Sequence, residues 1–232
     1  MSDGERPHSL TGWFTGVRRA LKRSTHVGGA KAPVVGEGVV HPSRALRPFL
    51  AGLRNVVAPV ILDLGPVIDS NIAFLGERLS CKVHIEDVFT AVDQLVRDGH
   101  ESQIGTLLAT RLGWGGEMFN GVLCWDLFDY LPADASAILI LEIARLLRPG
   151  GLMVAVFSTA RIDEPIHRKY VIVDDEHLEH RVRPAARGPR RVWLGREVQR
   201  AFAPLIVEES FLLRHRQRET VFRKPPRGRQ ET

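Results

Sequence analysis

Acidic residues follow two short apolar segments of the chain at a spacing that suits recognition of a nucleoside. Asp63 lies at the carboxyl end of the run 58–65, next to Gly65 and Pro66. Glu86 and Asp87 follow a second segment roughly 20 residues later, the distance at which βαβ units place an acid against ribose hydroxyls. A glycine at position 65 lets the chain turn sharply, so that the backbone amides of the turn can face a ligand. Carboxylates also end strands as solvated caps, so both interpretations stay open.

Strands and helices are predicted to alternate around these acids. Apolar patterns predict strands at 58–65, 82–86, 121–125 and 152–157. Helical periodicity predicts helices at 43–53, 70–79, 89–97, 102–112 and 133–147. Further strands are expected at 170–173, 179–183, 206–213 and 219–222, with a helix at 194–202. The predicted fold class is therefore α/β, a doubly wound and mostly parallel sheet with an antiparallel C-terminal edge.

The second half of this pattern carries a more specific motif. Phe119-Asn-Gly-Val-Leu-Cys-Trp-Asp126 is followed by Leu-Phe-Asp-Tyr-Leu131, a predicted helix, and Leu147-Arg-Pro-Gly-Gly151 before the next strand. This order resembles the class I S-adenosylmethionine-dependent methyltransferases, over about Val60–Ser158. The resemblance implies a Rossmann-like methyltransferase domain, S-adenosylmethionine as cofactor, and methyl transfer to an acceptor that the sequence does not identify. A nicotinamide dehydrogenase is disfavoured because its Gly-x-Gly-x-x-Gly loop is missing.

The resemblance also implies which residues hold the cofactor. Asp63 and Gly65 match the motif that holds its methionyl end, and Glu86 or Asp87 matches the acid that binds its ribose. The end of the strand at 121–125 matches the segment beside the reactive sulfonium. The candidate cofactor residues are Asp63, Gly65, Pro66, Asn71, Glu86, Asp87, Cys124, Trp125 and Asp126. Positioning and desolvation would supply most of the acceleration of an in-line methyl transfer.

The first loop departs from the family pattern of an acid followed by alternate glycines. Val67 and Asp69 stand where the second and third glycines would be, and a β-branched residue disfavours close approach of the backbone to a ligand. A strand expected between Asp87 and Phe119 is not evident, because that stretch has helical periodicity. The alternative is a catalytically inactive methyltransferase-like protein that acts in binding or as a scaffold. Closure of the pocket by Val67 and Asp69 would favour it.

The sequence assigns no catalytic residue and predicts no metal site. His167, His177 and His180 are candidate bases near neutral pH, and the last two also fit a solvated strand or loop. As zinc ligands these histidines lack a third partner at helical spacing. The two cysteines, Cys81 and Cys124, form no Cys-x-x-Cys pair.

Charge is divided unevenly along the chain, and this division indicates the partners. The net charge is +5, yet residues 49–160 hold 7 Lys/Arg against 13 Asp/Glu, so the ends of the chain are basic. A small-molecule acceptor is the first expectation, and the basic termini could also bind RNA or an acidic protein. The C-terminal arginines could bind an anionic substrate such as RNA or a phosphorylated metabolite; they include Arg181, Arg183, Arg187, Arg190 and Arg191. Trp193 is the one aromatic residue interleaved with them, whereas readers of single-stranded RNA use several stacking residues.

Three segments are expected along the chain. Residues 1–45 are predicted to be a mostly disordered basic arm with a short amphipathic helix at Trp13–Lys22. Residues 46–223 form the methyltransferase-like domain, and residues 224–232 a polar basic tail. No apolar run approaches the roughly 20 residues of a transmembrane segment, and the N-terminus lacks the apolar region of a secretory signal. A cytoplasmic location is therefore expected.

Overall fold

The computed structural model describes residues 38–227 of the chain. The predicted helix at Trp13–Lys22 lies outside the described residues, as does most of the predicted C-terminal tail. None of the described helices is long and apolar enough to cross a membrane.

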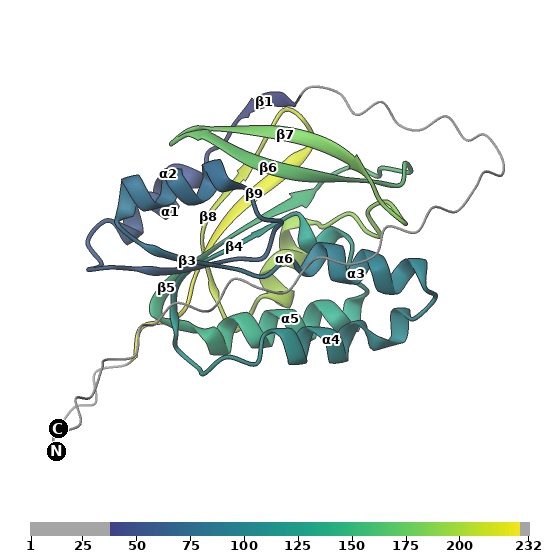
Figure 1. The fold of residues 1–232 in the computed structure, drawn as a ribbon, viewed down its shortest axis with the longest axis horizontal. Coiled ribbons are helices and arrows are strands. Elements are labelled where there is room, and N and C mark those ends of the chain that lie inside the picture. Colours follow the sequence, from purple (N-terminus) through teal and green to yellow (C-terminus); the bar gives the residue numbers. More distant parts are fainter. Residues whose placement is uncertain (1–37, 228–232) are drawn as a thin grey trace, which may run out of the picture. The chain divides into compact units, whose positions relative to one another are not determined.

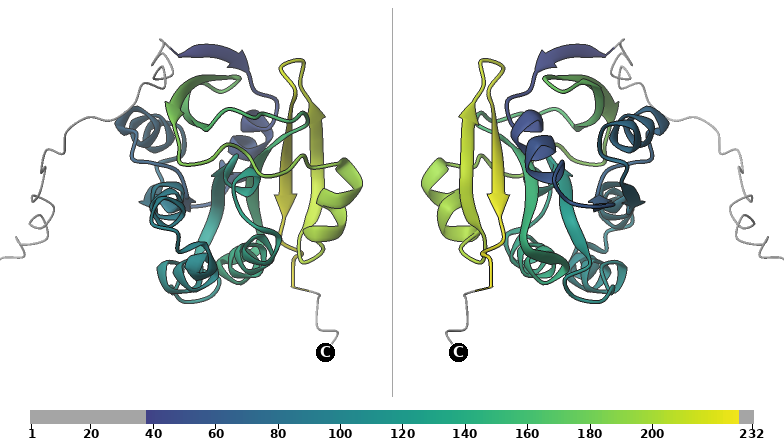
Figure 2. Two further views of the ribbon diagram at one scale, coloured as in Figure 1. Left: turned by 90° about the vertical axis from the view of Figure 1, so that its right-hand side faces the viewer. Right: turned by 90° about the vertical axis from the view of Figure 1, so that its left-hand side faces the viewer.

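A six-stranded sheet is the centre of the fold (Figure 1). Its order is β3-β2-β4-β5-β9-β8; the first four strands run parallel, and β9 is antiparallel to both of its neighbours. The strands are β2 (Val60–Asp63), β3 (Lys82–Ile85), β4 (Phe119–Trp125), β5 (Leu147–Ser158), β8 (Ile206–Leu212) and β9 (Gln217–Arg223). The predicted mostly parallel sheet with an antiparallel C-terminal edge is confirmed. Figure 2 shows that edge, β8 and β9, with a short helix beside it.

Helices cover both faces of this sheet, as expected for a doubly wound fold (Figure 1). One face carries α1 (Leu46–Leu53) and α2 (Asp69–Leu79). The other carries α3 (Val88–Arg97), α4 (Ile104–Arg111), α5 (Ala133–Leu146) and α6 (Gly195–Ala201). Each face has its own apolar cluster. All seven residues of β4 are buried, because this strand lies in the middle of the sheet with helices on both sides.

A second, three-stranded sheet lies over the face that carries α1 and α2 (Figure 1). It consists of β1 (Val39–Pro42), β7 (His177–Pro184) and β6 (Ile166–Asp174), all antiparallel. Tyr170, Ile172 and Leu178 from its inner side join the apolar cluster of α1 and α2. The β6–β7 hairpin matches the predicted strand pair, while β1 lies within the segment expected to belong to the N-terminal arm.

The segment between β3 and β4 contains no strand among its described residues. It holds α3, the single turn η1 (Glu101–Gln103) and α4, whose apolar residues Val88, Val92, Ile104 and Leu108 pack into one cluster. The helical periodicity of this stretch is thus confirmed, and the strand that the resemblance led us to expect is missing. As a result β3 is the edge strand of the main sheet.

Candidate functional site

The order of the parallel strands reverses beside β2. The chain passes from β2 to β3 on one side and returns with β4 on the other side of β2. The carboxyl ends of these strands, at Asp63, Ile85 and Trp125, therefore meet at one edge of the sheet. Open α/β sheets bind their ligands at this kind of reversal.

Asp63 is buried at the end of β2, and its carboxylate accepts hydrogen bonds from other groups of the protein. Its Oδ1 atom accepts hydrogen bonds from the Gly65 backbone N–H at 2.9 Å and from the Trp125 indole N–H at 2.7 Å. Burial raises the pKa of the Asp63 carboxyl to about 6; the two hydrogen bonds lower the pKa and the charge of Asp87 raises it. A buried acid at a strand reversal is a feature of functional sites as well as of structural networks.

The Trp125 side chain fills the space above Gly65. Trp125 adopts a left-handed backbone conformation (φ 50°), which turns the chain sharply at the end of β4. A methyl group on Gly65 would lie 2.8 Å from the indole, so only glycine allows this approach. The other face of the indole stacks on Tyr170 of β6, with ring centroids 5.3 Å apart and planes 5° from parallel.

The cavity that remains at the strand reversal has a volume of about 20 Å³. A volume of this size holds about one water molecule, whereas sites for small organic ligands measure roughly 300–1,000 Å³. Its lining residues come from the ends of β2 and β4, from α3 and from β6: Leu64, Gly65, Pro66, Ile68, Phe89, Cys124, Trp125, Asp126, Leu127, His167, Arg168 and Tyr170. The residues in this arrangement do not fit S-adenosylmethionine, since side chains of the protein occupy the space.

Five of the nine candidate cofactor residues line this cavity: Gly65, Pro66, Cys124, Trp125 and Asp126. Asp63 does not line the cavity, but it is hydrogen-bonded to Trp125, which does. Burial raises the pKa of the Cys124 thiol well above its usual value, and the nearby charge of Asp63 adds to the effect. The fold therefore brings most of the candidates together at this edge of the sheet.

The other three candidates bind elsewhere in the protein. Asp87 caps α3 by accepting hydrogen bonds from the Thr90 N–H and hydroxyl, at 2.9 and 2.7 Å. Glu86 forms an ion pair with Arg111 of α4. Asn71 is buried in α2; its side chain donates to the Tyr170 carbonyl at 2.9 Å and accepts from the Ile172 N–H at 2.8 Å. Asn71 thus fastens β6 to α2.

Val67 and Asp69, the residues in place of the family's glycines, are not what closes the site. Both are exposed, and neither lines the cavity. The closure comes instead from Trp125 and from Tyr170 of the hairpin. The condition that would favour the inactive alternative, closure by Val67 and Asp69, is therefore not met, although other side chains fill the pocket.

Charged residues cluster beside the cavity, and one of them, Asp126, is among the candidate cofactor residues. Asp126 precedes the single turn η2 (Leu127–Asp129) and Asp129 ends it, and Arg168 of β6 lies 3.8 Å from Asp126. Burial raises the pKa of Asp126 to about 6 and that of Asp129 well above its usual value. Asp129 Oδ2 accepts from the Ser158 N–H at 2.9 Å, while its Oδ1 has no hydrogen-bond partner among the described residues. No local pattern places β6 against η2, so the contact of Arg168 with Asp126 could not be predicted from the sequence.

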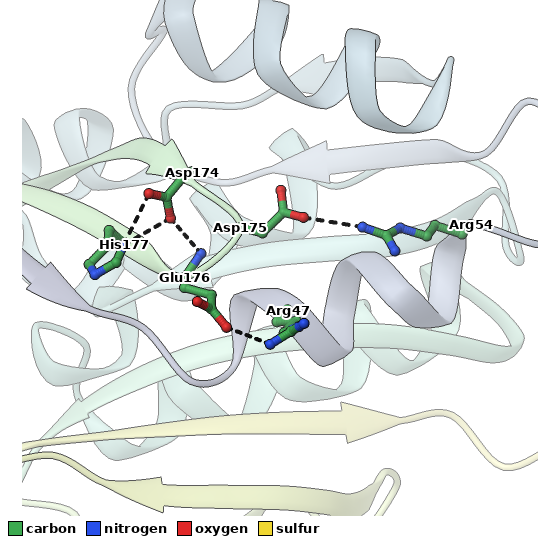
Figure 3. A network of polar contacts seen from close by, with 6 residues as sticks. All are labelled: Arg47, Arg54, Asp174, Asp175, Glu176 and His177. Atoms are coloured by element: carbon green, nitrogen blue, oxygen red, sulfur yellow. Dashed lines mark hydrogen bonds and ion pairs between the residues drawn. The ribbon is translucent and has the colours of Figure 1, made fainter.

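Ion pairs hold the turn of the β6–β7 hairpin against the helices. Figure 3 shows Arg47 of α1 and Arg54, the residue after α1, directed at this turn, where they contact Glu176 at 2.6 Å and Asp175 at 3.1 Å, respectively. Arg78 of α2 contacts the same Asp175 at 3.2 Å. The hairpin is therefore held over the strand reversal at two places: at its turn by these ion pairs, and along β6 by the hydrogen bonds of Asn71.

Of the three candidate histidine bases, only His167 lies at the cavity. Its ring stacks on Phe89 with centroids 4.1 Å apart, and burial lowers its pKa to about 4. His177 bonds to Asp174 in the hairpin turn (Figure 3), and His180 packs against His41 and Tyr170. Residues 38–227 contain no group of His, Cys, Asp or Glu that could hold a metal ion.

Comparison with known proteins finds similar solved structures at low identity. Neither a family model nor a curated protein sequence matches the chain. One similar structure is the 1,6-didemethyltoxoflavin-N1-methyltransferase of Burkholderia thailandensis with bound S-adenosylhomocysteine (19% identity, 78% of each chain covered, TM-score 0.47). Another is the CcbJ methyltransferase of Streptomyces caelestis (21% identity, 78% of this chain and 94% of that one, TM-score 0.46). A third is a putative sarcosine dimethylglycine methyltransferase from Galdieria sulphuraria (12% identity, 77% and 82% covered, TM-score 0.49).

The strand order itself identifies the fold. Parallel strands that reverse beside β2, with antiparallel β9 inserted between β5 and β8, form the Rossmann-like fold of the class I methyltransferases. The chain has this fold without the strand between β3 and β4.

Proposed function

We propose that this chain is a methyltransferase-fold protein that acts by binding and does not transfer methyl groups. The observation that carries this proposal is the position of Trp125. Its indole lies where the resemblance puts the methionyl end of the cofactor, bonded to Asp63 and in contact with Gly65.

The hydrogen bonds of the site support the proposal. In a cofactor-binding site, the acid and the glycine amide of the first loop would be available to the ligand. Here the Gly65 N–H donates to Asp63 Oδ1, and the same oxygen accepts from Trp125. A ligand would have to break these buried hydrogen bonds and the stack on Tyr170 before it could enter. Each buried polar group left without a partner would cost about 1–3 kcal/mol.

Methyl transfer from S-adenosylmethionine to a small-molecule acceptor is the second candidate function. The observation that favours it is that five predicted cofactor residues and His167 line a single cavity at the strand reversal. This function requires Trp125 and the β6–β7 hairpin to move away together. The cytoplasm is the proposed compartment for either function, because Cys81 and Cys124 are both free thiols.

Titration calorimetry with S-adenosylmethionine and S-adenosylhomocysteine separates the two functions. We expect no heat of specific binding from either compound with the unaltered protein. Micromolar binding would overturn the closed site on which the proposal rests, and a screen of methyl acceptors would then test the second candidate.

A variant tests whether Trp125 is the cause. Trp125→Ala enlarges the cavity, and measurable binding of S-adenosylhomocysteine to this variant alone would attribute the closure to the indole. The matched control is Trp114→Ala, which removes a tryptophan that packs on Phe119 and does not line the cavity. Both variants are checked by circular dichroism, since removing a buried tryptophan costs about 3–5 kcal/mol.

A further inference from the structure

A second, larger pocket lies between the two loops that connect the main sheet and its helix α6 with the second sheet. One loop follows β5, and the other connects β7 to α6. The pocket has a volume of about 480 Å³, within the range for small-molecule sites. Its lining residues are Ala160, Arg161, Ile162, Asp163, Arg187, Gly188, Pro189, Arg190, Arg191 and Val192. None of them lines the cavity at the strand reversal, so an inference about this pocket does not rest on the proposed function.

Backbone contacts fix the two loops against each other. The Ala185 N–H donates to the Pro165 carbonyl at 2.8 Å, and the Trp193 N–H donates to the Ser158 carbonyl at 3.3 Å. Between these points, Gly188 lies so close to the other loop that a methyl group on it would be 2.3 Å from the Glu164 carbonyl oxygen. The walls of the pocket are therefore held by the main chain and do not depend on a ligand.

Positive charge exceeds negative charge by two among the side chains that line this pocket and Glu101, which pairs with two of them. Arginine side chains line it at positions 161, 187, 190 and 191. Asp163 bonds to Arg161 at 2.6 Å. Glu101, on η1 outside the pocket, is shared between Arg187 and Arg190.

Arg191 is the arginine best placed to meet a ligand. Its guanidinium lies 3.7 Å from the centre of the Trp193 ring, and it has no carboxylate partner among the described residues. Stacking on a tryptophan holds a guanidinium plane in place while its N–H groups remain free to donate at the edge. Trp193 itself is buried, so this platform is rigid.

We propose that this pocket binds a small molecule through a phosphate group. Guanidinium groups match phosphate oxygens with paired hydrogen bonds, and a phosphate dianion neutralises the excess of two positive charges. The concave shape and the volume of about 480 Å³ suit a phosphorylated metabolite better than an RNA strand, which needs an extended surface with several stacking residues.

The test is a titration of the full-length protein with inorganic phosphate and with pyrophosphate at constant ionic strength. Arg191→Gln is expected to weaken binding roughly tenfold, the loss of one charged hydrogen-bonding group. Asp163→Asn removes the one acid of the lining and is expected to tighten binding about two- to fivefold. A purely structural role of Asp163 would not produce this gain.

Arg200→Gln is the matched control, because it removes the same charge from an exposed position on α6 that does not line the pocket. Its affinity should equal that of the unaltered protein. The proposal is overturned if phosphate and pyrophosphate do not bind, or if Arg200→Gln weakens binding as much as Arg191→Gln does. It is also overturned if a single-stranded RNA oligonucleotide binds while both phosphate compounds fail.

Discussion

Replacing Asp63 with asparagine is expected to stabilise the protein at neutral pH. Asp63 is 3% exposed, and burial raises its pKa from the ordinary value of 3.8 to about 6. Asparagine keeps a carbonyl oxygen that can accept from Gly65 and Trp125 but carries no charge to desolvate. The variant therefore loses little hydrogen bonding and avoids the cost of a buried charge.

The direction and size of the effect follow from the difference in pKa. Between pH 3.8 and about 6, the folded protein holds a proton on Asp63 that the unfolded chain has released, so stability from this group is lost as pH rises. The loss amounts to about 3 kcal/mol at about pH 7.5 and about 1 kcal/mol at about pH 4.5. Asp63→Asn should recover these amounts at the two pH values.

Urea unfolding at both pH values measures this effect. Asp69→Asn is the control, since Asp69 is an exposed aspartate in the first turn of α2; its loss should change stability by less than about 1 kcal/mol. The reasoning is refuted if Asp63→Asn destabilises the protein at about pH 7.5, or if its effect is the same at both pH values. The first result would mean that the donors need the Asp63 charge, and the second that the pKa of Asp63 is not raised in the folded protein.

Three further variants test how Trp125 and the β6–β7 hairpin pack over the strand reversal. Asn71→Ala leaves two buried backbone groups of β6 without partners and should cost about 2–4 kcal/mol in urea unfolding, with faster hydrogen exchange along β6. Gly65→Ala puts a methyl group 2.8 Å from the Trp125 indole and should cost about 1–3 kcal/mol; an unchanged thermal midpoint would contradict the close approach. Burial lowers the pKa of His180 to about 3, so its contribution to stability is lost as pH falls from 6.5 toward 3. His180→Asn should therefore reduce the dependence of the unfolding free energy on pH between 6.5 and 3. An unchanged dependence would mean that other groups nearby cause it, among them His41, His215 and Arg168.

Local patterns in the sequence were sufficient to predict the main sheet. The apolar runs around Asp63 and Trp125 are long enough to identify β2 and β4, and the alternation with helices implies their parallel order. The meeting of Asp63, Gly65 and Trp125 at one edge follows from that order. The helical periodicity between β3 and β4 was also correct, and it outweighed the strand implied by the resemblance.

The closure of the site could not be predicted, because it depends on contacts distant in sequence. Tyr170 stacks on Trp125 across 45 residues, and Asn71 bonds to β6 across about 100. Nothing near Trp125 in the sequence indicates its left-handed backbone conformation or the direction of its side chain. The arginine pocket likewise requires two loops that only the folded sheet brings together.

The most direct test of the account is native-state hydrogen exchange at the Trp125 indole N–H, with and without S-adenosylhomocysteine. We predict that this proton exchanges only through global unfolding, because it is bonded to buried Asp63 beneath the β6–β7 hairpin, which Asn71 holds on α2. Its opening free energy should equal that from urea unfolding and should not change with the compound. Exchange through a local opening of much lower free energy, together with protection by S-adenosylhomocysteine, would contradict the account and show that the cover is a lid over a working cofactor site.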